Sequence, residues 1–164
     1  MSLTLGIDPG SHITGYGIVE RQGRDIRYIA SGIIRVGRSK SKPERLLTIK
    51  QKLDEVLQRF APDAVAVEEI FMAKNPKSTL TLGEVRGVIL VAAAGAGVPV
   101  FEYTPREVKS SVVGAGAAHK SQVAAMVSRL LKPDHEPATV DETDALAVAF
   151  CHSLRATSAA GRLP

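Results

Sequence analysis

Apolar and polar residues alternate along the first part of the chain, which is the pattern of half-buried β-strands. The first alternating stretch, 3–7, leads into Asp8, where a Pro-Gly pair signals a turn. Two further stretches, 13–20 and 26–36, are separated by a short polar turn at 22–25. Neighbouring strands joined by short turns pair antiparallel, so this part predicts a three-stranded meander.

After this meander the apolar spacing changes from two to three or four, as in a helix with one buried face. The helical pattern begins at Pro43, runs to Phe60 and is stopped by Pro62. A short apolar run of strand type, 64–67, leads directly into Glu68. A strand reached through a helical crossover lies parallel to the earlier strand, so we expect this fourth strand to pair with the first through a right-handed crossover.

The remainder of the chain predicts one more strand and four helices. The strand covers 98–102, and the helices cover 78–94, with Ser78 or Thr79 as the cap, 104–112, 119–131, and 139 to about 154. Helices interleaved with strands in this order predict an α/β fold. Its sheet is expected to be mixed, with three antiparallel strands plus parallel strands, and flanked by helices.

Composition fits one globular domain. The chain has 164 residues, 45% of them hydrophobic and 23% charged. We expect a domain over 1–155 and a flexible C-terminal tail over 156–164, where the sequence is polar and rich in alanine.

Several features favour the cytoplasm over a membrane or an oxidising compartment. The chain opens without a basic and apolar leader, so secretion is not expected. The longest apolar run, 88–100, contains Gly and Pro and is shorter than the roughly 20 residues of a membrane span. The single cysteine, Cys151, cannot form an internal disulfide, which is typical of a reducing cytoplasm.

The chain is moderately basic, with 21 Lys and Arg against 17 Asp and Glu and a pI near 9.4. This excess permits a nucleic-acid partner without requiring one. A polar loop over 36–43 carries Arg38, Lys40 and Lys42. Such loops are usually only solvated, and an anionic partner nearby would give these cations a function.

Acidic residues stand at the ends of two predicted strands and at the start of the last helix. Asp8 and Glu68 end strands that are expected to be parallel, and ligands bind at that edge of such sheets. Asp141 and Asp144 are three residues apart, which places them side by side on one helix face. Interaction with the helix dipole explains Asp141 well, but it explains Asp144 less well, because Asp144 adjoins the apolar stripe and repels Asp141.

If the fold gathers these four carboxylates, a divalent ion has to offset their repulsion. Oxygen ligands without a His or Cys cluster point to Mg²⁺, with Mn²⁺ as a substitute. Four carboxylates suit two ions about 3.5–4 Å apart, which activate a water and stabilise the leaving alkoxide in phosphodiester hydrolysis. Glycines beside the end of the first strand leave room for a phosphate or a metal to approach. The cations expected to neutralise DNA phosphates, besides those of the 36–43 loop, are Lys74, Lys77, Arg86, Arg106, Lys109 and Lys120.

Six motifs are spread from the first strand to the last helix. They are Gly-Ile-Asp-Pro-Gly-Ser (6–11), Thr-Gly-Tyr-Gly (14–17), Glu-Glu-Ile-Phe-Met-Ala-Lys-Asn (68–75), Pro-Val-Phe-Glu-Tyr (99–103), Lys-Ser-Gln-Val (120–123) and Asp-Glu-Thr-Asp-Ala-Leu-Ala (141–147). Jointly they closely resemble the RuvC family of bacterial Holliday-junction resolvases. The resemblance implies a ribonuclease-H-like fold and a cytoplasmic bacterial homodimer that acts with a branch-migration motor. It also implies paired symmetric nicks across a four-way DNA junction during recombination and repair, with 5′-phosphate ends.

The resemblance also implies residue roles. By position, Phe71 matches an aromatic residue that unstacks bases near the crossover, and Lys109 and Lys120 match lysines near the scissile phosphates. The family's catalytic and metal-binding carboxylates, with two ions per subunit, are matched by Asp8, Glu68, Asp141 and Asp144.

Three positions depart from the family pattern. Glu69 stands where relatives often have Gln, so Glu68 is the better choice of the adjacent pair. His12 replaces a common Arg, which puts a phosphate contact at that position in doubt. Some relatives have His at position 141, where this chain has an acid that favours an all-oxygen site.

The glycine- and alanine-rich helix over 78–95 has two interpretations. Small residues permit close packing within the chain, whereas a homodimer makes this helix a candidate subunit contact.

Two functions of other classes compete with a nuclease. Sugar kinases and actin-like proteins also open on a strand with Asp-x-Gly, but this chain is too short for their two lobes and lacks a second glycine-rich phosphate loop. A non-catalytic junction-binding module would keep the fold, and the complete set of four carboxylates argues against it.

Overall fold

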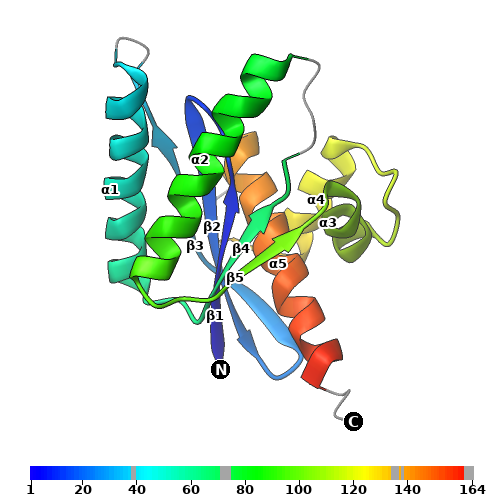
Figure 1. The fold of residues 1–164 in the computed structure, drawn as a ribbon. Coiled ribbons are helices and arrows are strands. Elements are labelled where there is room, and N and C mark those ends of the chain that lie inside the picture. The colour runs from blue at the N-terminus through cyan, green and yellow to red at the C-terminus, as the bar shows by residue number, and fades with distance from the viewer. Residues whose placement is uncertain (38–39, 71–74, 134–136, 138, 161–164) are drawn as a thin grey trace.

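The computed structural model describes residues 1–37, 40–70, 75–133, 137 and 139–160. Within these residues, the strands form one sheet in the order β3-β2-β1-β4-β5, and helices cover both faces of it (Figure 1). The elements are β1 (Ser2–Asp8), β2 (Ile13–Gln22), β3 (Asp25–Arg35), α1 (Lys42–Phe60), β4 (Ala64–Glu68), α2 (Pro76–Gly95), β5 (Val100–Tyr103), α3 (Pro105–Val113), α4 (Lys120–Leu131) and α5 (Val140–Ala160).

The sheet is mixed, as the sequence predicts. β1, β2 and β3 pair antiparallel. The hairpin of β2 and β3 turns at Gly23, which takes the left-handed conformation (φ 63°) that glycine adopts without strain. β4 pairs parallel with β1, and β5 pairs parallel with β4. The meander and the crossover through α1 are therefore confirmed.

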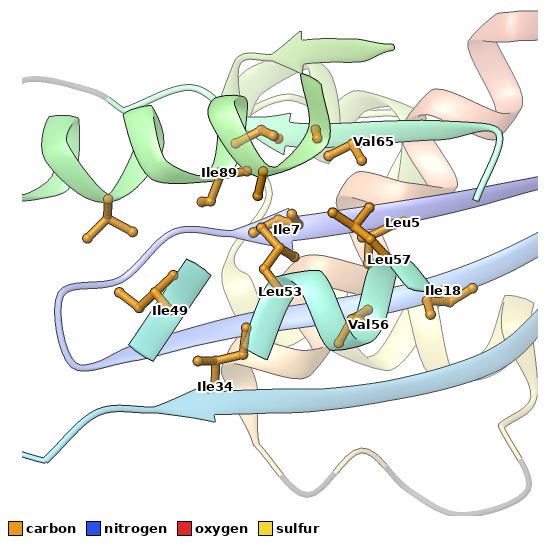
Figure 2. Close-up of a cluster of buried hydrophobic side chains, with 14 of the residues drawn as sticks. Leu5, Ile7, Ile18, Ile34, Ile49, Leu53, Val56, Leu57, Val65 and Ile89 are labelled. Atoms are coloured by element: carbon orange, nitrogen blue, oxygen red, sulfur yellow. The ribbon is translucent and has the colours of Figure 1, made fainter. Parts of the chain in front are cut away.

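Strand alternation divides the core into two layers. On one face, Leu5 and Ile7 of β1 and Val65 of β4 are fully buried against α1 and α2 (Figure 2). On the other face, Gly6 approaches α5, and Ala66 packs in the cluster that α3, α4 and α5 form. Since side chains of successive strand residues point to opposite faces, Asp8 and Glu68 continue the second set and face α5.

Helix α5 packs closely on the sheet because glycines lie beneath it. A Cβ at Gly15 would lie 2.0 Å from the carbonyl oxygen of Asp141, and one at Gly6 would lie 2.2 Å from that of Ala145. A Cβ at Gly17 would come within 2.7 Å of the side chain of Leu146. The expectation that these glycines leave room for a phosphate or a metal is therefore wrong for Gly15 and Gly17, because α5 fills that space.

The observed bounds differ from the expected ones at several places, including the starts of α2 and β5 and the end of α5. Asn75, rather than Ser78 or Thr79, caps α2, and its side chain accepts a hydrogen bond from the backbone N–H of Lys77 at 2.9 Å. β5 begins at Val100 instead of residue 98. α5 continues to Ala160, whereas the helical pattern was expected to end near Leu154. The division into a domain over 1–155 and a tail stays a prediction.

Among the described helices, α2 is long and apolar enough to cross a membrane by length and composition alone, although only 22% of that stretch is buried. In this fold its buried residues, among them Val85, Ile89 and Ala93, pack in the layer between α1 and the sheet. One face of α2 is therefore buried against the sheet and α1, and its outer face remains exposed.

Candidate active site

The four predicted carboxylates come together at one end of the sheet. Asp8 is the last residue of β1 and Glu68 the last of β4, and the two strands are neighbours in the parallel register that pairs Ile7 with Val67. The first turn of α5 lies at the same end (Figure 1). It follows that both strand carboxylates face the segment that carries Asp141 and Asp144.

The start of α5 is fixed by a cap and by the glycine of β2. The hydroxyl of Thr139 accepts a hydrogen bond from the backbone N–H of Glu142 at 3.2 Å, so Thr139 is the cap that the sequence predicts. The backbone of Asp141 rests on Gly15, and Gly15 pairs with Asp8 across β1 and β2. Asp141 is thereby held directly beside the strand that carries Asp8.

Burial and the crowding of negative charge raise the pKa values of the two strand carboxyls. Burial, followed by the charges of Glu68, Asp144 and Asp141, raises the pKa of Asp8 to about 7, against the opposing effect of Lys120. Burial and the charge of Asp144 also raise the pKa of Glu68. This mutual influence places all four carboxylates in one electrostatic cluster.

Two lysines accompany this cluster. The Nζ of Lys120, at the start of α4, lies 3.0 Å from Oδ2 of Asp144, and this hydrogen bond and charge raise the pKa of Lys120. The positive charge of Lys109 on α3 opposes the rise in the pKa of Glu68 that burial causes. Both lysines line a pocket of about 170 Å³ together with Glu68 and Asp144. The structure therefore brings the predicted lysines and carboxylates together.

The donor atoms fit a hard divalent ion, although they do not form a finished cage. No three His, Cys, Asp or Glu side chains of the described residues are arranged to hold one ion by themselves. Mg²⁺ usually takes one or two carboxylates and completes its shell with waters and substrate phosphate oxygens. An all-oxygen cluster beside a pocket open to a phosphate suits that requirement.

Several predicted DNA-binding cations lie near this end of the molecule, at the starts of α1 and α2 (Figure 1). Lys40 donates to the hydroxyl of Thr48 at 2.9 Å, and Lys42 lies 3.0 Å from Glu84. Lys77 lies in the first turn of α2 and is exposed. The first two cations already have partners within the chain, so DNA would have to compete for them.

Arg86 and Arg106 lie on other elements. The guanidinium of Arg86 on α2 is paired with Glu102 of β5 at 2.5 Å. Arg106 is exposed on α3. Three further predicted DNA contacts, Arg38, Phe71 and Lys74, lie outside the described residues.

Sequence reasoning missed one residue of this region. Glu142 is only 6% exposed, and its carboxylate accepts a hydrogen bond from the hydroxyl of Ser31 on β3 at 2.8 Å. The Thr-x-x-Glu spacing of 139–142 is the signature of a capping box and could have singled out Glu142. The contact with Ser31 has no local signal, because 111 positions separate the two residues.

Comparison with known proteins agrees with this geometry. The family model described as crossover junction endodeoxyribonuclease RuvC matches residues 4–152. The crossover junction endodeoxyribonuclease RuvC of Histophilus somni is 50% identical over 153 residues, which are 93% of this chain and 80% of that protein. The same protein of Vibrio cholerae (strain O395) is 50% identical over 93% of this chain and 87% of its own length.

A solved structure shares the whole fold. It is the T. thermophilus RuvC in complex with Holliday junction substrate, with 36% identity and a TM-score of 0.91 over 97% of each chain. The expected mixed sheet and its helices are thereby confirmed as a ribonuclease-H-like fold of this kind. On the family match, the sequence identity and the shared fold, the chain belongs to the RuvC family of crossover junction endodeoxyribonucleases.

Proposed function

We propose that this chain resolves four-way DNA junctions by Mg²⁺-dependent hydrolysis of phosphodiester bonds, in recombination and repair. The observation that carries the proposal is the clustering of Asp8, Glu68, Asp141 and Asp144 at one end of the sheet, with the pKa of Asp8 raised to about 7. Such crowding costs stability unless a cation compensates it. Membership of the family supplies the substrate, a Holliday junction, and the reaction class.

The four carboxylates would hold two Mg²⁺ ions per subunit, with Mn²⁺ as a substitute. The bound ions supply an activated water and stabilisation of the leaving oxygen. Asp8 has to lose its proton to act as a ligand, because only an ionised carboxylate binds Mg²⁺ well. The products of hydrolysis would be a 5′-phosphate and a 3′-hydroxyl.

The lysines contribute positive charge where negative charge develops. Lys120 lies at the edge of the cluster with its side chain 74% exposed, so its ammonium group can reach a bound phosphate as well as Asp144. Positive charge held in place at that point stabilises the transition state. Lys109, which lines the same pocket, is the second candidate for this role.

The DNA would be held chiefly through its phosphates. Exposed cations at the starts of α1 and α2 and on α3 supply the positive charge, so affinity should fall steeply with salt. We assign phosphate contacts to Lys77 and Arg106 first, since no ion pair is found for either within the described residues. The remaining assignments are Arg38, Lys40, Lys42, Lys74 and Arg86, with Phe71 as the residue that unstacks bases.

Two copies of the chain would be needed for a junction. A four-way junction with two-fold symmetry has matching strands, and two active sites related by the same symmetry can nick both of them. We therefore infer a homodimer, and we place it in the bacterial cytoplasm with a branch-migration motor as a further partner.

The decisive experiment is a nicking assay on a synthetic four-way junction, with and without Mg²⁺. Asp8→Asn should bind the junction and fail to cleave it, because the amide keeps the shape and removes the negative charge. A linear duplex of the same sequence is the control substrate and should remain uncut.

The assay also separates the alternatives. Equal cleavage by Asp8→Asn and the wild type would contradict the role of Asp8. Binding without any cleavage by the wild type would leave a non-catalytic junction-binding module instead.

A further inference from the structure

Glu142 forms a buried connection between α5 and the outer strand β3. One carboxylate oxygen accepts from the hydroxyl of Ser31 at 2.8 Å, and the other lies 3.3 Å from the hydroxyl of Thr139. The hydroxyl of Tyr28 lies 3.2 Å from that of Ser31. Since Ser31 donates its proton to Glu142, Tyr28 donates to Ser31. These bonds satisfy a carboxylate that would otherwise be costly to bury.

The connection ties the first turn of α5 to β3. Glycines bring α5 down onto β1 and β2, and buried residues such as Leu146 and Phe150 hold the helix farther along, whereas its first turn is joined to β3 by the bond from Ser31 to Glu142. Ser31 lies on β3, beside Gly17 in the register of β2 and β3. A bond that reaches past β2 to Ser31 fixes which side of the first turn of α5 faces β3.

The orientation of Glu142 determines where its neighbours point. Successive residues of an α-helix are turned by roughly 100° about its axis. With Glu142 directed to β3, Asp141 is turned by one such step in one direction, and Asp144 by two steps in the other. Any rotation of α5 would move both carboxylates relative to Asp8 and Glu68.

We propose that the Glu142–Ser31 hydrogen bond sets the orientation of the first turn of α5 and thereby places Asp141 and Asp144 for metal binding. Glu142 is a positioning residue, because it acts through its neighbours and not on the substrate. The proposal rests on the proposed function, since it concerns the same carboxylate cluster. Groups that orient metal ligands typically affect metal affinity or activity by about 10–100-fold.

Ser31→Ala is the cleanest variant. It removes the bond to β3 and leaves the bonds between Glu142 and Thr139 that begin the helix. Glu142→Ala removes the bond to Ser31 and the side-chain bond to Thr139 but keeps the backbone N–H that donates to Thr139, whereas Glu142→Gln keeps an oxygen that can accept from Ser31. Ser111→Ala is a matched control, because the Ser111 hydroxyl also contacts α5, at Cys151 (3.1 Å), but far from its first turn.

We would measure kcat and KM for junction cleavage in Mg²⁺, and Mn²⁺ binding to the DNA-free protein by calorimetry. Ser31→Ala and Glu142→Ala should lower kcat by about 10–100-fold and weaken Mn²⁺ binding, with KM for the junction unchanged. Glu142→Gln should recover most of both, and Ser111→Ala should match the wild type. The double variant Ser31→Ala/Glu142→Ala should be no worse than Glu142→Ala, because both remove the same bond.

The outcomes are distinguishable. Wild-type kcat and Mn²⁺ binding in Ser31→Ala would overturn the proposal, even if Glu142→Ala is impaired, because that loss would then belong to the helix cap. A raised KM with unchanged kcat would overturn it too, since it would indicate a role in DNA binding. A wild type that does not cleave junctions would contradict the proposed function itself.

Discussion

At the scale of single residues, Asp8 combines a predicted position with an effect that only the fold shows. The sequence places Asp8 at the end of a core strand and predicts its three acidic neighbours, but it does not give how deeply Asp8 is buried. The structure raises its pKa from an ordinary value of 3.8 to about 7. Such a shift depends on three other segments of the chain, so no local pattern could have given it.

This shift makes the stability of the metal-free protein depend on pH. Between the unfolded pKa near 4 and the folded pKa of about 7, the folded state binds more protons at Asp8 than the unfolded state does. Stability should therefore fall as pH rises through this window, by at most about 4 kcal/mol from Asp8. We expect thermal unfolding in EDTA to occur at lower temperature at pH 8 than at pH 5.

Two comparisons isolate the cause. Asp8→Asn should reduce this fall, because its side chain has no proton to lose, and Mg²⁺ should restore wild-type stability at pH 8 by binding the folded state. A wild type that is equally stable in EDTA at both pH values would contradict the raised pKa assigned to Asp8.

At the scale of elements, the periodicities of two and 3.6 predict every strand and helix of the described chain. Errors occur at boundaries, where Asn75 replaces the expected cap of α2 and α5 runs on to Ala160. The packing of α5 on glycines was not predicted, because a glycine next to a turn usually indicates backbone freedom and gives no sign of the helix that will cover it.

Gly15→Ala tests this packing. The new methyl group would meet the backbone carbonyl oxygen of Asp141. Because this oxygen belongs to a helix, the whole of α5 would have to shift. We expect a loss of about 1–3 kcal/mol in the free energy of unfolding, together with lower cleavage at temperatures where the protein remains folded. Chemical denaturation and the nicking assay measure the two effects.

Gly95→Ala is the control for that substitution. A Cβ at Gly95 has open space around it, so this variant should keep both stability and cleavage. A Gly15→Ala protein as stable and active as Gly95→Ala would show that α5 is not held as close as described.

At the scale of the whole molecule, the exposed face of α2 is the feature that a single chain leaves unexplained. Leu80 and Val91 are 70% and 62% exposed, and a Cβ at Gly83 or Gly87 would have nothing within 4 Å. The sequence left intrachain burial and a subunit contact open. Buried and exposed apolar residues now occur on the same helix, which is consistent with both.

Sedimentation of Gly87→Glu tests the inferred dimer. A buried charge at the subunit contact would be costly, so the variant should dissociate to monomers while its monomer remains folded. Arg24→Glu, at the exposed tip of the β2–β3 hairpin, is the control and should sediment as the wild type does. A Gly87→Glu protein that remains dimeric would exclude α2 from the interface.

The hydrogen bond between Ser153 on α5 and Thr4 on β1 joins residues 149 positions apart. It marks a fold in which one face of the opening strand stays uncovered until the final helix has been made. During translation, Asp8 and Glu68 leave the ribosome long before Asp141 and Asp144 do. A nascent chain therefore cannot assemble the proposed nuclease centre, and cutting activity begins only when synthesis has reached the last helix.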